Sequence, residues 1–435
     1  MKRSAIIIGS GFGGIASAIR LKAMGYDVNL VEKLDQLGGR ARVFKKKGYT
    51  FDAGPTVITA PFLFDELFEL FKKKRSDYIE FKPLKPWYQF YFHNGEIFNY
   101  GGTIKDTEDE IKRFNPADVS GYRKLLKTSE KIFNTGFTKL SHIPFDNFFF
   151  MIKQIPSLIK LKSYLTVFEL VSKYIKNDSI KKALSIQPLL LGGNPLSTTS
   201  IYNLIHFLER KWGVHYAMGG TGALVNAFKK LMLEEKIKVS LNSEVSEILF
   251  DKDRAMGVRF KNGKKLFSDI VVSNADPAYV YSNMIDQKIT GKWNKKKVEK
   301  LAFSMGLFVI YFGTKKKYKN IEHHTIWMGE RFEGLLNDIF KNKILAKDFS
   351  LYLHRPTATD QSMAPENCDC FYVLSPVPNL QSSVNWKNTA EMYKDSILEA
   401  LEKTIMPNLR KNLDVCFYMT PKDFEKDYLS KNGSG

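Results

Sequence analysis

The chain begins with two apolar runs that flank a group of glycines and a helical segment. Residues 4–8 form a short apolar run typical of a buried strand. Residues 15–24 have a helical pattern that ends at Gly25, a residue suited to the position just past a helix. Residues 27–31 form a second apolar run, which ends at Glu32. This order predicts a strand–turn–helix–strand unit.

The later pattern alternates between strand-rich and helical regions. Residues 81–100 are aromatic-rich and contain Asn94-Gly95, which predicts strands joined by a hairpin. Residues 106–208 are mainly helical in pattern, and strand-like runs return from Ile237. Residues 301–312 are almost wholly apolar and predict a buried strand, because the run is too short to cross a membrane.

Residues 143–175 combine bulky apolar side chains with lysines. Pro156 interrupts the run and predicts a break there. Such an amphipathic segment either lies in a membrane interface or packs as a helical cap on the protein core, and the pattern leaves both open. Its apolar residues include Phe145, Phe148, Phe149, Phe150, Met151, Ile155, Leu158, Ile159, Leu161, Leu165, Val167 and Phe168, and its lysines include Lys153, Lys160, Lys162 and Lys173.

The composition is that of a globular protein with more than one domain. The chain has 435 residues, 44% of them hydrophobic and 26% charged, which exceeds what one hydrophobic core usually serves. We find no apolar run of 18 residues, which argues against a spanning helix. The 3 cysteines are too few for a disulfide framework, so we expect a reducing, cytoplasmic environment.

The charge is strongly positive, since 66 Lys and Arg residues face 46 Asp and Glu residues, a net charge of +20. This excess suits nucleic acid or an anionic membrane surface, or it is only compositional. The 33 phenylalanines favour contact with an apolar partner such as a membrane. We therefore predict peripheral binding to anionic membranes and no nucleic-acid partner.

The glycines after the first apolar run have the G-x-G-x-x-G spacing. Gly9 allows the tight turn, Gly11 allows a pyrophosphate to approach the backbone, and Gly14 allows the helix to pack closely on the strand. Glu32 ends the second strand, where an acid accepts hydrogen bonds from ribose hydroxyls. The glycine spacing alone is a weak signal, but this strand–helix–strand context predicts a dinucleotide site.

Two further motifs distinguish the kind of dinucleotide. Gly38, Gly39 and Arg40 follow the second strand and place bare backbone and a cation beside a diphosphate. Residues 51–57 add Gly54 and Pro55. With the glycine turn and Glu32, these motifs resemble FAD-dependent oxidoreductases of the amine oxidase and carotenoid desaturase superfamily.

A more specific resemblance covers residues 4 to about 430. Its motifs are most similar to the bacterial and fungal type phytoene desaturases, which are carotenoid desaturases. They lie at residues 189–195, 200–202, 216–224, 323–326, 354–357 and 374–380.

The resemblance implies an α/β fold with a Rossmann-like, glutathione-reductase-like FAD-binding domain. The second domain is expected to be a discontinuous substrate domain with a mixed sheet and a helical, membrane-facing cap. The FAD-binding domain is expected to comprise residues 1–75, 214–290 and 415–435, and the substrate domain residues 76–213 and 291–414. Family members continue into a glycine- and proline-rich stretch and a final helix, so we expect this chain to be C-terminally truncated.

The motifs and the resemblance together predict the cofactor contacts. Residues 274–277 also form a strand-to-helix cap, with Asp276 before Pro277. The predicted FAD contacts are Gly9, Gly11, Phe12, Gly13, Gly14, Glu32, Lys33, Gly38, Gly39, Arg40, Gly54, Pro55, Thr56, Val57, Val245, Ala275 and Asp276.

The resemblance implies desaturation of phytoene or a related carotene by hydride transfer to FAD, in carotenoid biosynthesis. An apolar tunnel lined by residues 54–59, 148–168 and 301–312 is expected to hold the substrate. Asp276 and Arg355 are candidates for an acid or base, each with a structural alternative. The alternative functions are an amine oxidase-like enzyme and a non-catalytic isoprenoid or lipid binder of the same fold.

We expect no metal site. Cys368-Asp369-Cys370 lacks a second cysteine pair at zinc spacing. His323 and His324 are adjacent and are expected to point to opposite sides of a strand, which would not suit joint ligation.

Overall fold

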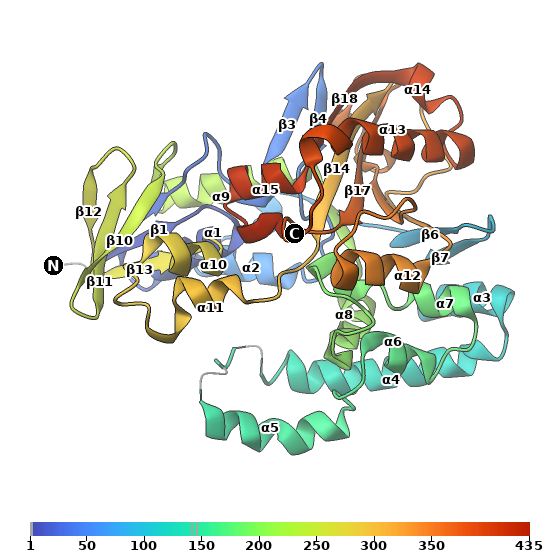
Figure 1. Cartoon of the computed structure of the whole chain (residues 1–435), viewed down its shortest axis with the longest axis horizontal. Helices are drawn as coiled ribbons and strands as arrows, with labels where there is room; N and C mark the ends of the chain where they lie inside the picture. Colours follow the sequence, from blue (N-terminus) through green and yellow to red (C-terminus); the bar gives the residue numbers. More distant parts are fainter. Residues whose placement is uncertain (1–2, 141, 145–146) are drawn as a thin grey trace.

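The predicted strand–turn–helix–strand unit is present at the start of the chain. The computed structural model describes residues 3–140, 142–144 and 147–435. β1 (Ser4–Ile8) lies between β13 (Ile270–Ser273) and β2 (Asp27–Val31) in a parallel sheet that β9 (Lys238–Ser240) completes. This sheet lies beside the N-terminus in Figure 1.

Both faces of this sheet are covered, as a parallel sheet requires. Ile7 packs into a core with α1 (Phe12–Ala23) and α9 (Gly220–Glu234). Ile6 and Ile8 face the opposite way, toward an antiparallel sheet of β10 (Val245–Asp251), β11 (Arg254–Phe260) and β12 (Lys265–Phe267). The alternating side chains of β1 thus join two cores.

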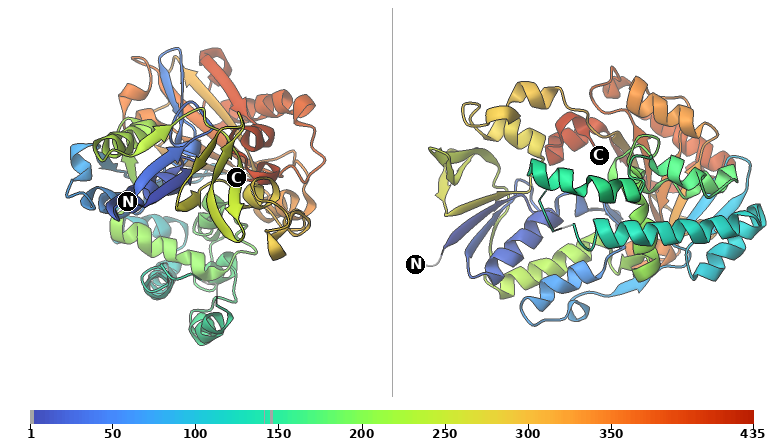
Figure 2. Two further views of the ribbon diagram at one scale, coloured as in Figure 1. Left: turned by 90° about the vertical axis from the view of Figure 1, so that its left-hand side faces the viewer. Right: turned by 90° about the horizontal axis from the view of Figure 1, so that it is seen from below.

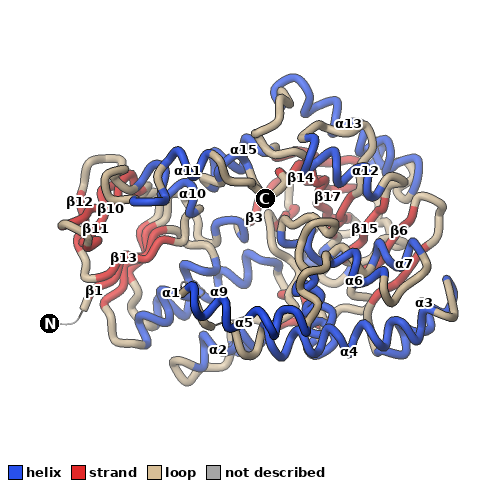
Figure 3. Tube along the Cα trace, turned by 60° about the horizontal axis from the view of Figure 1, so that its bottom comes forward, coloured by secondary structure: helices blue, strands red, loops and turns tan. Residues whose placement is uncertain are grey.

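A seven-stranded mixed sheet forms the second lobe, and the two groups of strands stand apart in Figure 3. β15 and β6 are parallel, whereas the other neighbours are antiparallel. α13 (Trp386–Thr404) packs on it through an apolar core. The strands, in spatial order, are β18 (Leu413–Met419), β14 (Gly306–Thr314), β17 (Asp369–Val377), β16 (Leu351–His354), β15 (His324–Met328), β6 (Tyr88–Phe92) and β7 (Ile97–Tyr100).

One predicted strand boundary is wrong in this lobe. The apolar strand begins at Gly306 rather than Leu301, because pairing with β17 starts only there and Leu301 is exposed. The predicted domain boundary between residues 414 and 415 falls inside β18, which belongs to the seven-stranded sheet. Apolar pattern alone does not show where a strand finds a partner.

Helices dominate residues 104–212, as predicted, and they lie below the sheets in Figure 1. α5 is the lowest of them in Figure 1; the left view of Figure 2 again shows it at the bottom, and the right view, from below, shows it in front of the other elements. The predicted break at Pro156 is wrong, since α5 continues through this residue. The helices are α3 (Ile104–Phe114), α4 (Asp118–Gly136), α5 (Phe148–Lys160), α6 (Val167–Ser172), α7 (Asp178–Ala183) and α8 (Leu204–Trp212).

Short elements complete the fold. Two two-stranded sheets are present, one of β3 and β4 and one of β5 and β8. Among the described residues, no helix is both long enough and apolar enough to cross a membrane. The remaining elements are β3 (Val43–Lys46), β4 (Tyr49–Asp52), β5 (Phe81–Pro83), β8 (His215–Ala217), α2 (Phe62–Glu69), α10 (Pro277–Tyr279), α11 (Lys295–Glu299), α12 (Phe332–Asn337), α14 (Leu409–Asn412) and α15 (Pro421–Tyr428).

Candidate active site

The glycine turn between β1 and α1 is built for close approach of backbone. Gly9 has a φ of 90°, which favours glycine. A Cβ on Gly14 would lie 1.9 Å from the carbonyl oxygen of Gly9, so only glycine lets helix and strand pack this closely. Gly11 precedes α1 without a side-chain cap, and the first turn holds no acidic residue. The amide groups at this helix N-terminus are therefore available to an anion.

Glu32 holds the turn in place from the end of β2. Its Oε2 accepts hydrogen bonds from the backbone N–H of Ser10, at 2.7 Å, and from the Ser10 hydroxyl, at 2.6 Å. Within residues 3–140, 142–144 and 147–435, its Oε1 accepts only from the backbone N–H of Leu34, at 2.9 Å. Since each carboxylate oxygen can accept two bonds, Oε1 retains capacity for a ribose hydroxyl.

The second glycine motif lies directly on the first. A Cβ on Gly39 would be 3.3 Å from the Cα of Gly11, which places the two loops in contact. Arg40 follows, and its guanidinium donates to the Ser430 hydroxyl and to the carbonyl of Gly435. Burial lowers the pKa of this guanidinium, and the charge of Asp276 partly offsets that effect.

These loops surround a cleft of about 530 Å³. Gly13 and Gly14 are not in its lining, because they lie within α1 and pack on the protein. Gly54, Thr56 and Val57 are also outside it and line a neighbouring cavity instead. The predicted contacts that do line the cleft are Gly9, Gly11, Phe12, Glu32, Lys33, Gly38, Gly39, Arg40, Pro55, Val245, Ala275 and Asp276.

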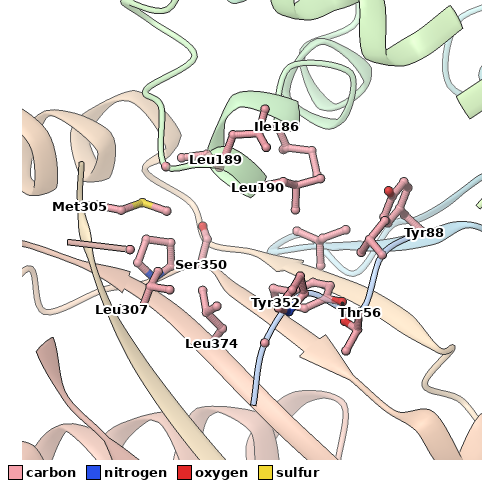
Figure 4. Close-up of a pocket in the computed structure, with 18 of the residues that line it drawn as sticks. Thr56, Tyr88, Ile186, Leu189, Leu190, Met305, Leu307, Ser350, Tyr352 and Leu374 are labelled. Atoms are coloured by element: carbon pink, nitrogen blue, oxygen red, sulfur yellow. Dashed lines mark hydrogen bonds between the residues drawn. The ribbon is translucent and has the colours of Figure 1, made fainter. Parts of the chain in front are cut away.

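The neighbouring cavity encloses about 720 Å³ and is predominantly apolar. It shares Arg40 and Pro55 with the cleft, so the two spaces meet there. Figure 4 shows side chains converging on it from a helical segment and from the strands of the large sheet. Among its apolar lining residues are Ile186, Leu189, Leu190, Met305, Leu307, Val309 and Leu374.

Two of the three segments predicted to wall a substrate tunnel line this cavity. Residues of the turn 54–59 and of β14 line the cavity. The expectation for residues 148–168 is wrong, because none of them lines it. Residues 186–192 and 204–209 supply the helical wall instead. The cause is tertiary, since α5 lies on the outside of the helical region.

The cavity lining contains a carboxyl group that the sequence patterns do not predict. Glu209 lies in the lining, fully buried on α8, and its Oε1 accepts a hydrogen bond of 2.9 Å from the Tyr88 hydroxyl. Its Oε2 has no hydrogen-bond partner among the described residues, and burial raises the pKa of the carboxyl to about 7. The sequence signal is its helical spacing of four residues from Ile205, which lines the same cavity.

A hydroxyl network forms another part of the cavity wall. The Thr56 hydroxyl lies 3.2 Å from that of Tyr352 and 2.9 Å from that of Tyr372. The Tyr352 hydroxyl also lies 2.7 Å from Nδ1 of His324. Figure 4 shows Thr56 and Tyr352 side by side. Burial raises the pKa of both tyrosines, so they remain neutral hydroxyls.

The two candidate acid–base residues occupy different settings. Asp276 lines the cleft and caps α10 by accepting a hydrogen bond of 3.0 Å from the backbone N–H of Tyr279, as the cap motif predicted. Arg355 lies outside both described linings. It pairs with buried Asp369 at 3.1 Å, which gives it a structural role.

The expected geometry of the paired histidines is wrong. The ring centroids of His323 and His324 lie 4.6 Å apart rather than on opposite faces of a strand. β15 begins only at His324, so the alternation of strand side chains does not apply to His323.

Residues 12–364 match the family of flavin containing amine oxidoreductases. The lycopene-forming phytoene desaturase of Pseudescherichia vulneris is 41% identical over 435 residues, covering 100% of this chain and 88% of that protein. The corresponding enzyme of Pantoea ananas is 41% identical over 429 residues, covering 98% and 87%. A solved oxidoreductase from Methanosarcina mazei shares the fold, with a TM-score of 0.64, 16% identity and coverage of 96% and 88%.

The fold and the site define this protein as a flavin-dependent oxidoreductase. Within this class, the chain belongs to the phytoene desaturases of the flavin containing amine oxidoreductase family. Its cofactor is FAD, and the cleft with its uncapped helix N-terminus suits the diphosphate of that group. The expected C-terminal truncation is not supported by these comparisons.

Proposed function

We propose that this chain desaturates a phytoene-type carotene, with FAD in the cleft and the hydrocarbon in the apolar cavity. The observation that carries the proposal is the junction of the two spaces at Arg40 and Pro55. An apolar cavity of about 720 Å³ suits a long hydrocarbon better than a charged amine.

Desaturation converts a CH₂–CH₂ unit into CH=CH, so a hydride leaves one carbon and a proton leaves its neighbour. Bound FAD supplies the hydride acceptor. The apolar walls orient the chain and exclude water. Glu209 is a carboxyl of the lining with an unpartnered oxygen, and a pKa of about 7 leaves it able to take up the proton near neutral pH.

The test uses the full chain with FAD and liposomes that contain phytoene, without oxygen. We expect loss of oxidised-flavin absorbance and a product with a longer chromophore, whereas polyamines should have no effect. Leu374→Arg places a charge in the cavity and should abolish product formation while FAD remains bound. Leu233→Arg, at an exposed leucine on α9, is the control. Normal turnover of a folded Leu374→Arg protein would show that the substrate lies elsewhere.

We further propose that α5 binds the membrane from which the substrate comes. No residue of this helix is buried, and the side chains of Phe148, Phe149 and Ile159 are 69%, 80% and 60% exposed. Lys153 and Lys160 are also exposed on it. An exposed apolar surface with lysines suits insertion at an anionic headgroup boundary, and each basic residue there contributes about 1 kcal/mol.

Liposome co-sedimentation tests this role of α5. The wild type should bind anionic vesicles. Salt should weaken the electrostatic contribution of the lysines and leave the contribution of the apolar side chains. Changing Phe148 and Phe149 to Ser should reduce both binding and turnover on vesicle-held substrate. A matched control changes Leu233 and Phe267, which are exposed on other elements, to Ser. Equal binding by the two double variants would exclude α5 as the contact.

A further inference from the structure

Three histidines meet in the interior, next to the cavity but outside its lining. His324 opens β15 and pairs in register with His354, the last residue of β16, while His323 precedes β15. The ring centroid of His323 lies 4.6 Å from the ring centroid of His324 and 4.9 Å from that of His354. All three side chains are buried.

Each ring is oriented by a hydrogen bond at one nitrogen. Nδ1 of His323 lies 2.6 Å from the Thr359 hydroxyl, and Nδ1 of His324 lies 2.7 Å from the Tyr352 hydroxyl. Nε2 of His354 lies 3.2 Å from Oδ2 of Asp52. A hydroxyl or carboxylate behind each imidazole is the arrangement that orients histidines bound to metals.

The second nitrogen of each ring has no hydrogen-bond partner in the part of the chain that the structure describes. These atoms are Nε2 of His323, Nε2 of His324 and Nδ1 of His354. Leaving a buried polar atom unpaired costs about 1–3 kcal/mol, so three such atoms on neighbouring rings indicate an occupant that satisfies them together. One ring nitrogen from each histidine lies within 4.8 Å of the other two.

We propose that His323, His324 and His354 bind one divalent transition-metal ion, with Zn²⁺ as the representative. Neutral imidazole is a preferred ligand of these metals, and three histidines with a water form a four-coordinate set. With Zn–N bonds of about 2.1 Å, tetrahedral ligands lie about 3.4 Å apart, so shifts on the order of 1 Å close the site. Buried Asp52 provides a compensating negative charge.

Such an ion would link the cavity wall to α9, the helix that packs on the parallel sheet. Tyr352, which bonds to His324, lines the cavity. Asp52, which bonds to His354, also accepts hydrogen bonds from the backbone N–H and the hydroxyl of Thr221 on α9, at 2.7 and 2.9 Å. The metal therefore has a positioning role, distinct from hydride transfer.

The experiment measures metal in the full-length protein isolated with FAD from cells grown with added zinc, so that the ion can enter during folding. Elemental analysis should find roughly one zinc per chain. His354→Gln should lower metal content at least tenfold. His206→Gln is the matched control, because His206 is equally buried but both its nitrogens have partners.

A second measurement uses only the wild type, so that the proposal remains testable if the His354→Gln variant does not fold. Wild type isolated from cobalt-containing medium should show the visible absorption of four-coordinate Co²⁺. Its absence, together with zinc at background level in the wild type, would overturn the proposal. Retention of full metal content by folded His354→Gln would do the same. FAD content is measured in parallel, so that loss of flavin is not mistaken for loss of metal.

Discussion

Replacing Arg355 by Leu should destabilise the protein rather than remove a catalytic group. The guanidinium Nε donates to Oδ2 of Asp369 at 3.1 Å, and its Nη1 donates to the carbonyl of Ile321 at 2.5 Å. Asp369 is fully buried, and the hydroxyl of Thr357 and the backbone N–H of Tyr318 also donate to it. Removing one partner of a buried pair leaves an uncompensated charge and costs about 3–5 kcal/mol.

Thermal unfolding of the FAD-loaded protein measures this cost, and turnover per bound FAD is recorded beside it. Arg331→Leu is the control, because Arg331 pairs with Asp338 and Asp348 at the surface, where such pairs contribute about 0–1 kcal/mol. We expect a large fall in the midpoint for Arg355→Leu, a small fall for Arg331→Leu, and normal turnover in whatever protein remains folded. If Arg355→Leu left the thermal unfolding midpoint unchanged but abolished turnover, this reasoning would be refuted and Arg355 would be a catalytic candidate again.

Two further predictions concern the cofactor turn and the cavity. Gly14→Ala should strongly reduce FAD retention, because its Cβ would lie 1.9 Å from a backbone oxygen. Gly13→Ala should be milder, because the atoms nearest to its Cβ belong to the side chain of Asn274, which can move; the flavin content of both variants checks this. Glu209→Gln should alter the pH dependence of stability. Since its pKa is raised from 4.5 to about 7, Glu209 favours the folded state most below pH 4.5, and this contribution is lost as the pH rises through 7. The difference in unfolding free energy between wild type and Glu209→Gln should therefore shift by about 3 kcal/mol between pH 4.5 and 8, in favour of the variant at high pH, as measured by urea unfolding; a constant difference would mean that the carboxyl titrates normally.

The sequence by itself determined the elements whose signals are local. The apolar runs and the glycines correctly predicted β1, the glycine turn, α1 and β2. Glu32 directly follows β2, as expected. The hairpin at Asn94-Gly95 and the cap at Asp276 are likewise present. Such features depend on neighbouring residues, so short windows of sequence contain them.

Only the tertiary structure decided which distant residues share a site. It placed α5 on the outside, put Glu209 in the cavity wall, and brought His354 to His323 and His324 through the pairing of β15 with β16. Strand order, register and helix packing depend on contacts far apart along the chain, and no periodic pattern encodes them. The same amphipathic pattern in residues 148–160 fits core and interface equally well, because it records the apolar face of a helix and not what covers that face.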